Sequence, residues 1–152
     1  MKFLTYIEKK NSTKGYGFLF NDRVIDIPRA AKWTSDNNGN NHFLSLPHSL
    51  KEALENWTHN YVILKQLENE ISGVDIESFS FQESDLIILP PVPNPPAFRD
   101  FYAFEQHAKA ARKLRGLEMN PDWYKIPIFY FSNPNCCYGH QAEIPYPDKT
   151  TE

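Results

Sequence analysis

Short alternations of apolar and polar residues occupy the first part of the chain. Residues 2–8 alternate, residues 16–20 form a second apolar run, and residues 23–27 form a third that ends at Pro28. A period of two is typical of half-buried strands, and the polar segments between these runs are typical of turns. We therefore expect three short strands in an antiparallel meander.

Helical spacing replaces this alternation farther along. The polar run 35–41 predicts a surface loop. Ser49 followed three residues later by Glu52 matches a capping box, which predicts a helix start. A second helix is expected over residues 60–71, and the apolar stripes of both helices should belong to the core. The expected stripes are Leu50, Leu54 and Trp57 in the first helix and Tyr61, Leu64, Leu67 and Ile71 in the second.

A proline-rich segment separates two parts of the chain. It follows the apolar run 85–89, which predicts a buried strand. Five of the seven residues 90–96 are proline, and proline removes backbone donors and favours extended structure. We expect an α+β fold with a leading domain over 1–89, a linker over 90–97 and a second domain over 98–152. A rigid loop within one domain is the alternative interpretation.

Beyond the linker, the pattern predicts a helix from Asp100 to Gly116. Asp100 is a suitable N-cap, and Gly116 is suited to a left-handed C-cap. Residues 126–131 predict a strand, and the polar remainder is interrupted by Pro145 and Pro147. The apolar stripe of the helix would consist of Phe101, Phe104, Ala108, Ala111 and Leu114.

Charge and composition exclude several classes of partner. The chain has 152 residues and a net charge of −3, with a pI of about 5.9. No strong field attracts nucleic acid or an anionic membrane. No window approaches the roughly 20 apolar residues of a membrane span, and the first apolar run is too short for a signal peptide. We expect a cytoplasmic protein.

The two cysteines, Cys136 and Cys137, are adjacent. Neighbouring cysteines rarely form a disulfide with each other, and no CxxC spacing is present. Buried thiols without a chemical role are expected. A reactive thiol, with Cys137 and His140 as nucleophile and base, is the weaker alternative.

Asp100 and His107 are the candidate chemical pair of the predicted helix. Seven residues apart, they would lie on nearly one face, about 10 Å apart along the axis. A carboxylate there could bind Mg²⁺, and a histidine could act as a general base on water. Ordinary capping by Asp100 and a structural role for His107 are the alternatives that spacing leaves open.

Further side chains of this region could contact a substrate. Tyr102 and Tyr130 could donate hydrogen bonds, and Arg112 and Arg115 could meet a carboxylate. Cations near the C-terminus of a helix also favour the helix dipole, which is the alternative for the arginines. One carboxylate alone holds Mg²⁺ poorly, so more oxygen ligands would be needed.

The order of these segments resembles the fumarylacetoacetate hydrolase family. The resemblance rests on PPVPNPPAFRDFYAFEQHAKAARKLRG, PDWYKIPIFYFSNPN and IPYP, from about residue 86 to 149. The first ninety residues look like the smaller leading domain of bacterial members. The resemblance implies a metal-dependent hydrolase of aromatic-compound catabolism that acts on carbon–carbon bonds of oxo-acids, typically acylpyruvates and related diketo acids.

The resemblance also implies roles for individual residues. Many bacterial relatives carry Lys-Pro where this chain has Asn133-Pro134, so the substrate contact of that lysine is in question. The implied roles are Asp100 as a ligand of Mg²⁺ (or Ca²⁺ or Mn²⁺), His107 as the base that activates water, Tyr102 and Tyr130 as substrate contacts, and Arg115, with Arg112 as the alternative, as the carboxylate-binding residue.

The family pattern continues with a Glu-x-Glu pair that would be expected just beyond Glu152. We therefore expect an N-terminal part of such an enzyme, nearly inactive alone, with most metal ligands beyond residue 152. Strand 126–131 would expose an apolar edge, which predicts a homodimer or association with the missing half. Only residues 1–89 are expected to fold independently. Alternatives are a non-catalytic binding or assembly module and a small free-standing α+β protein.

Overall fold

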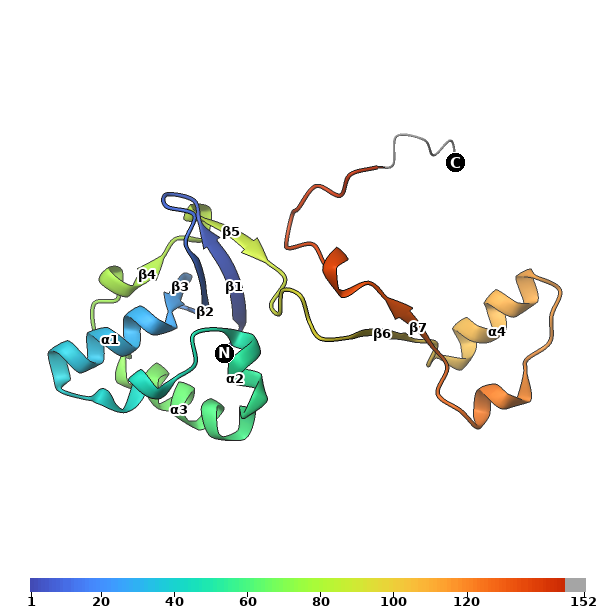
Figure 1. Ribbon diagram of the computed structural model, residues 1–152, viewed down its shortest axis with the longest axis horizontal. Helices are drawn as coiled ribbons and strands as arrows, with labels where there is room; N and C mark the ends of the chain where they lie inside the picture. The colour runs from blue at the N-terminus through green and yellow to red at the C-terminus, as the bar shows by residue number, and fades with distance from the viewer. Residues whose placement is uncertain (147–152) are drawn as a thin grey trace. The chain divides into compact units, whose positions relative to one another are not determined.

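The computed structural model describes residues 1–146 and confirms the α+β class (Figure 1). The chain divides into two compact units. Unit 1 is Met1–Pro93 with the segment that starts at Cys137, and unit 2 is Asn94–Cys136. The helices and strands are β1 (Phe3–Glu8), β2 (Lys14–Phe20), β3 (Arg23–Asp26), α1 (Ile27–Asn38), α2 (Leu50–Glu55), α3 (Trp57–Glu70), β4 (Ser80–Phe81), β5 (Leu86–Leu89), β6 (Phe98–Phe101), α4 (Glu105–Leu114) and β7 (Phe129–Ser132), with short 3-10 turns η1 (Asn41–Ser45), η2 (Glu77–Phe79), η3 (Glu83–Asp85), η4 (Pro121–Tyr124) and η5 (Pro134–Cys136).

The division between the units falls inside the predicted linker 90–97. The segment from Cys137 groups with unit 1, whereas the predicted second domain runs from 98 to 152. The partition into domains therefore stays a prediction. The expectations for Pro147 and Glu152 lie outside the described residues.

Five antiparallel strands form the sheet of unit 1 in the order β4-β3-β2-β1-β5. Phe18 of β2 lies opposite Phe3 on one side and Ile25 on the other, which confirms the predicted meander. β5 adds to the free side of β1. Because β5 lies at the sheet edge, it buries Leu86 but leaves Ile87 49 % exposed. The prediction of a buried strand over 85–89 is wrong in that respect.

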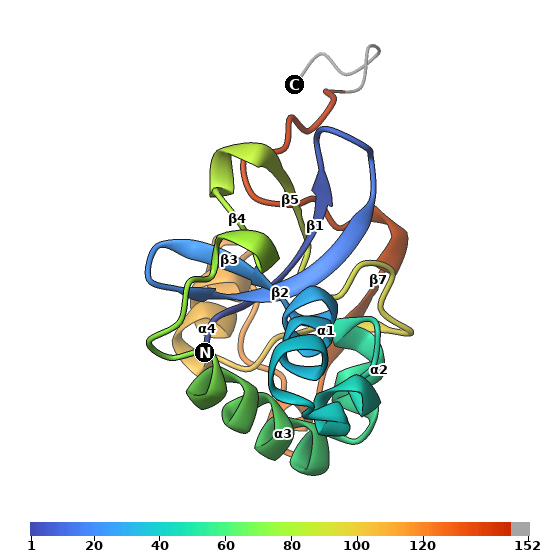
Figure 2. The same cartoon turned by 90° about the vertical axis from the view of Figure 1, so that its left-hand side faces the viewer.

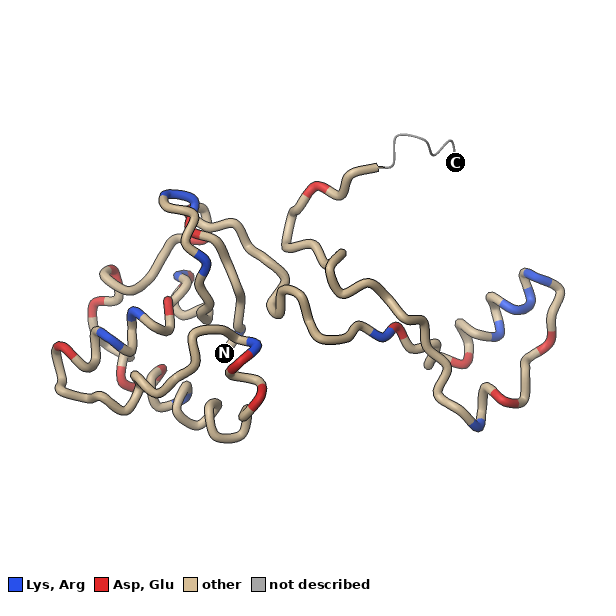
Figure 3. Tube along the Cα trace, viewed as in Figure 1, with Lys and Arg blue, Asp and Glu red and all other residues tan. Residues whose placement is uncertain are grey.

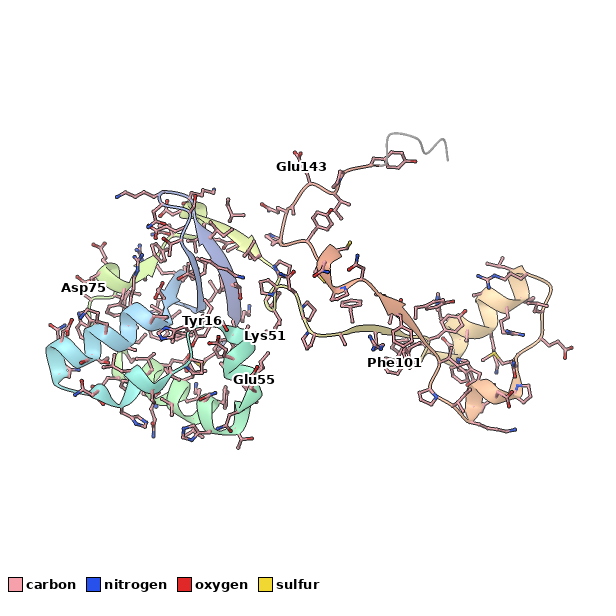
Figure 4. The ribbon with its side chains drawn as sticks, in the orientation of Figure 1. Tyr16, Lys51, Glu55, Asp75, Phe101 and Glu143 are labelled. Carbon is pink, nitrogen blue, oxygen red and sulfur yellow. The ribbon has the colours of Figure 1, made fainter. Side chains whose placement is uncertain are left out.

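The helices α1, α2 and α3 cover one face of this sheet (Figures 1 and 2). Phe18 and Ile25 point from the sheet into a core that they share with Leu64 and Leu67 of α3. Tyr16 of β2, labelled in Figure 4, is buried in the same core. Burial of these side chains is the main source of stability for such a two-layer arrangement.

The helix start at Ser49 is confirmed, because its side chain accepts a hydrogen bond from the Glu52 N–H at 3.2 Å. The expected stripe is only partly correct. Leu54 and Tyr61 are 44 % and 39 % exposed, and Ala53 is buried instead. The reason is that α2 ends at Glu55, so the chain turns before a longer stripe can form.

The helix α1 begins where we expected a strand to end at Pro28, and it continues into the range 35–41, where we expected a loop. Asp26 caps it by accepting a hydrogen bond from the Arg29 N–H at 2.8 Å, and Pro28 lies in its first turn. Proline suits this position because its missing N–H would have no helical partner there. The helix then continues to Asn38, so the prediction of a loop over 35–41 is wrong for the first part of that range.

The other face of the sheet carries a buried polar group. The ring of Tyr6 crosses Gly15, where a Cβ atom would lie 2.7 Å from the ring. The Tyr6 hydroxyl donates to Asp26 Oδ2 at 2.6 Å. Arg29 pairs with Glu8 at 2.9 Å and lies 3.8 Å from Asp26. Burial, followed by the nearby Asp26 carboxylate, raises the pKa of Tyr6.

Unit 2 is built on an antiparallel pair, β6 and β7, in which Phe98 lies opposite Ser132 and Phe101 opposite Phe129. Ala108 is the one buried residue between 94 and 136. Large apolar side chains, among them Phe101 (Figure 4), are exposed. Unit 2 therefore has almost no core of its own.

The expected helix from Asp100 to Gly116 is wrong at its start. Asp100 lies in β6, and α4 begins at Glu105. Aromatic residues favour strands, and pairing with β7 gives the Asp100 backbone its partners. The left-handed conformation of Gly116 is confirmed by its φ of 69°. The predicted strand 126–131 is displaced to Phe129–Ser132.

The expected apolar stripe of this helix is also wrong. Phe104 is 81 % and Leu114 89 % exposed, while Ala108 is buried. Phe104 lies outside the helix, at its N-cap position, so the stripe loses its first turn.

Candidate functional site

Asp100, Tyr102 and Tyr130 lie on one face of the β6–β7 pair. Asp100 is directly opposite Tyr130. The Tyr102 N–H donates to the Ile128 carbonyl at 3.0 Å, which continues the ladder one residue beyond Phe101. Because side chains alternate along a strand, Tyr102 shares the face of Asp100. The structure thus groups three of the predicted site residues.

His107 joins this group through Tyr102. It lies in the first turn of α4, and its ring meets the Tyr102 ring edge-on, with centroids 5.3 Å apart and an interplanar angle of 80°. The expectation that Asp100 and His107 share one helix face is wrong, because Asp100 is on a strand. The two residues come instead from two elements joined by a short connection.

Arg115 lies at the other end of α4, about 12 Å from His107 along the axis. Cations gather at this end of the helix (Figure 3), where they favour the helix dipole. Arg112 Nε donates to the Glu118 carbonyl at 2.5 Å and so fastens the chain that follows the helix. The structure does not bring Arg115 to the group around Tyr102.

Residues of the turn η4, which spacing alone does not reveal, support the site. Trp123 Nε1 donates to the Tyr102 carbonyl at 2.8 Å. The Tyr124 hydroxyl donates to Glu105 Oε1 at 2.7 Å, and Lys109 Nζ lies 2.6 Å from the same oxygen. Of these contacts, only the i,i+4 pair of Glu105 and Lys109 has a spacing that can be recognised in the sequence.

The same contacts shift the ionisation of three exposed groups. Hydrogen bonds from Lys109 and then Tyr124 lower the pKa of Glu105. The hydrogen bond to Glu105 raises the pKa of Lys109 and also that of Tyr124. At neutral pH the carboxylate is therefore charged and both donors are protonated.

A cavity of about 180 Å³ opens beside Tyr102. Its walls are largely apolar and aromatic, and they include Phe101, Trp123, Ile126 and Ile128. A space of this kind suits a small apolar group rather than a charged one.

The opposite face of the β6–β7 pair has a different character. The Arg99 guanidinium lies 4.1 Å from the centre of the Phe131 ring and 5.5 Å from that of Phe129. These are cation–π contacts, which stabilise cross-strand neighbours. Arg99 was not among the predicted site residues, and its position follows from strand alternation.

Asp100 alone does not make a metal site. It is an exposed single carboxylate, and residues 1–146 include no group of three or more His, Cys, Asp or Glu that could hold a metal ion. Mg²⁺ requires several oxygen ligands. Any metal bound at Asp100 needs oxygen donors beyond those that the described part of the chain provides.

The cysteines differ from expectation. Both thiols are free, Cys136 is exposed and Cys137 is half-buried, so the prediction of two buried thiols is wrong. Asn133 Nδ2 lies 3.1 Å from the sulfur of Cys136. The short turn η5 keeps Cys136 at the surface.

Comparison of the sequence with models of known protein families gives no match, and comparison with curated proteins also gives none. Within residues 1–146, every helix is too short or too polar to cross a membrane. The candidate site therefore rests on the residues and contacts described above.

Proposed function

We propose that the chain is part of a metal-dependent enzyme of the fumarylacetoacetate hydrolase type. It would act in the cytoplasm on a carbon–carbon bond of an acylpyruvate or related diketo acid. The observation that supports this most directly is the grouping of Asp100, Tyr102 and Tyr130 on one face, with His107 in contact with Tyr102. These are the residues to which the resemblance assigns the chemistry.

The side chains suit the two steps of such a hydrolysis. His107 would accept a proton from water as the water adds to the carbonyl next to the scissile bond. The hydroxyls of Tyr102 and Tyr130 would donate hydrogen bonds to substrate oxygens on which negative charge develops. The carbon–carbon bond then breaks, and the departing enolate is reprotonated on carbon.

Asp100 would be one ligand of a divalent cation, and that cation, when bound, would supply positive charge for the enolate oxygens. Arg115 would hold the carboxylate of the substrate. Arg115 lies about 12 Å from His107 along α4, a separation that only a substrate longer than acetylpyruvate would span. The missing oxygen ligands would come from residues other than those of the described part of the chain, and we propose association as a homodimer or with a further chain.

Titration with Mn²⁺ and acetylpyruvate, followed by NMR of the full chain, tests the proposal. Even the weak binding expected of a single carboxylate should let the paramagnetic Mn²⁺ broaden the amide signals around Asp100, and Asp100→Asn should abolish the broadening. Asp122→Asn is the matched control, because Asp122 is also exposed in unit 2 and its carboxylate forms an ion pair with Lys125, at 3.6 Å. Acetylpyruvate should shift the signals of Tyr102, His107 and Tyr130.

Two results would contradict the proposal. One is Mn²⁺ broadening that is unchanged in the Asp100→Asn variant. The other is an acetylpyruvate response that leaves Tyr102 and His107 unaffected. Rapid turnover of acetylpyruvate by the 152-residue chain alone would contradict the narrower expectation that this chain lacks most of the metal ligands.

A binding or assembly module is a second candidate function. It is favoured by the exposure of Phe104 (81 %), Phe131 (77 %) and Leu114 (89 %) in unit 2, since large exposed apolar groups favour association. Light scattering would test it. A module should associate without metal and lose association in Phe104→Ser or Phe131→Ser, whereas a clean wild-type monomer would contradict the idea.

A further inference from the structure

The turn η4 contacts both sides of the junction between β6 and α4. Trp123 donates to the carbonyl of Tyr102, the residue that continues β6. Tyr124, the next residue, donates to Glu105, the first residue of α4. Two consecutive side chains therefore link the strand that carries Asp100 to the helix that carries His107.

Apart from the ring contact between Tyr102 and His107, the described residues offer the junction little capping and packing. Residues 102–104 are all that lie between β6 and α4, and the N-cap of α4, Phe104, makes no side-chain capping hydrogen bond. Phe104 is 81 % exposed and so contributes little packing. A helix start without a cap of its own takes its orientation from contacts elsewhere.

Both contacts of η4 come from one short capped turn. Asn120 caps η4 by accepting a hydrogen bond from the Asp122 N–H at 2.9 Å, and Pro121 lies in its first turn. The rings of Trp123 and Tyr124 are 5.0 Å apart and nearly perpendicular, at 85°. The two donors therefore belong to neighbouring rings that contact each other on one turn.

We propose that η4 is a brace that sets the position of His107 relative to Tyr102 and Asp100, with Trp123 and Tyr124 as positioning residues. The catalytic value of this brace rests on the proposed function, because the residues it positions are those assigned to the reaction. The arrangement of the side chains itself does not depend on that function. Without the brace, α4 would pivot at residues 102–104, and the imidazole would leave the edge of the Tyr102 ring.

Glu105 is the acceptor on which one arm of the brace depends. Its Oε1 atom accepts a hydrogen bond from the Tyr124 hydroxyl at 2.7 Å and lies 2.6 Å from Lys109 Nζ. The lowered pKa of Glu105 keeps the carboxylate charged, which strengthens both contacts. An amide oxygen at this position would still accept from Tyr124, whereas a methyl group would not.

The test is the nuclear Overhauser effect between the rings of Tyr102 and His107, measured in the full chain without ligand. Trp123→Phe removes the indole donor and keeps a ring, and Tyr124→Phe removes one exposed hydroxyl. The matched control is Lys125→Ala in the following residue, which removes the 3.6 Å ion pair with Asp122 and leaves both arms in place.

Each single variant should weaken the ring-to-ring signal, and the double variant should lose it, while Lys125→Ala keeps it. Glu105→Ala should weaken the signal, and Glu105→Gln should restore most of it. The amide chemical shifts of Phe101 and Phe129, which report the β6–β7 ladder, should keep their wild-type values in all variants, because the ladder does not depend on η4. If η4 merely supported the fold of unit 2, the variants would change the amide signals of Phe101 and Phe129 together with the ring-to-ring signal.

An undiminished ring-to-ring signal in the double variant would overturn the brace. If Trp123→Phe also changes the amide signals of Phe101 and Phe129, then Tyr124→Phe and the two Glu105 variants test the proposal instead, because they alter only exposed side-chain groups. Wild-type signals in all three would likewise overturn it. Because no ligand is used, failure of the brace is distinct from failure of the Mn²⁺ and acetylpyruvate titrations.

Discussion

Asp26 illustrates how one residue of this chain serves two elements. Its Oδ1 atom accepts the Arg29 N–H that starts α1, while Oδ2 accepts the hydroxyl of Tyr6 from β1. The second contact is possible only because Gly15 leaves room for the Tyr6 ring. A buried carboxylate is tolerated here because hydrogen bonds and Arg29 satisfy it.

Removal of the Tyr6 hydroxyl should therefore destabilise unit 1. We expect Tyr6→Phe to lower the free energy of unfolding by about 1–2 kcal/mol, since a buried acceptor loses its donor. Urea denaturation of the full chain measures this. Tyr61→Phe is the control, because Tyr61 is 39 % exposed on α3. An equal effect of both changes would contradict the argument.

Alkaline pH should destabilise the same unit. Burial is the main cause that raises the pKa of both Tyr6 and Tyr16. The hydroxyl of Tyr16 donates to the Pro47 carbonyl at 2.5 Å. Above pH about 10 an unfolded tyrosine releases its proton, whereas these two keep theirs when folded. The free energy of unfolding should thus fall as pH rises, by up to about 1.4 kcal/mol per pH unit for each tyrosine.

Urea midpoints measured between pH 8 and 11 would follow this loss. Below the unfolded pKa the stabilisation should be fully present, so the midpoint should change little between pH 8 and 9 on account of these groups. Tyr6→Phe and Tyr16→Phe should each make the alkaline fall shallower. A slope unaffected by either substitution would show that other groups cause it.

At the scale of an element, the end of α1 depends on Gly39. Its φ is 65°, and a Cβ atom there would meet nothing within 4 Å. Gly39→Ala should therefore destabilise by backbone strain alone, about 1 kcal/mol. Gly39→Asn should cost less, because asparagine tolerates this conformation. Thermal unfolding of both variants measures the difference, and a more stable alanine variant would contradict it.

The meander strands β1, β2 and β3 and the helix α3 could be predicted from the sequence, because their apolar patterns match their burial. α1 could not, since Pro28 after an apolar run indicates a strand end as readily as a helix start. Asp100 shows the same ambiguity: it suits a helix cap, but its pairing with Tyr130 involves residues 30 positions away, and local spacing contains no sign of that partner.

The candidate site was predictable only as a set of residue types. Tyr102 and His107 do meet, but through an edge-on ring contact between a strand end and a helix start, not along one helix. The support from Trp123 depends on a backbone carbonyl, and no side-chain pattern encodes such a partner.

At the scale of the whole molecule, the stability of the chain should reside in unit 1. Apart from Ala108, each apolar residue found buried within 1–146 lies between Leu4 and Leu86. The described residues from Cys137 onward are half-buried or exposed and add none. Unit 2 relies on the β6–β7 pair, and an isolated two-stranded pair is marginally stable in water.

The chain 1–93 should accordingly unfold cooperatively, with a free energy of unfolding within roughly 0.5 kcal/mol of that of the full chain, since it retains the whole apolar core. Urea denaturation compares the two. In the full chain, hydrogen exchange should be slow for amides of β1 and β2 and fast for those of β6 and β7, because local stability follows buried contacts. Exchange in β6 as slow as in β1 would mean that unit 2 gains its stability from an interaction outside its own residues, which is the behaviour expected if its exposed aromatic side chains are covered by a second chain.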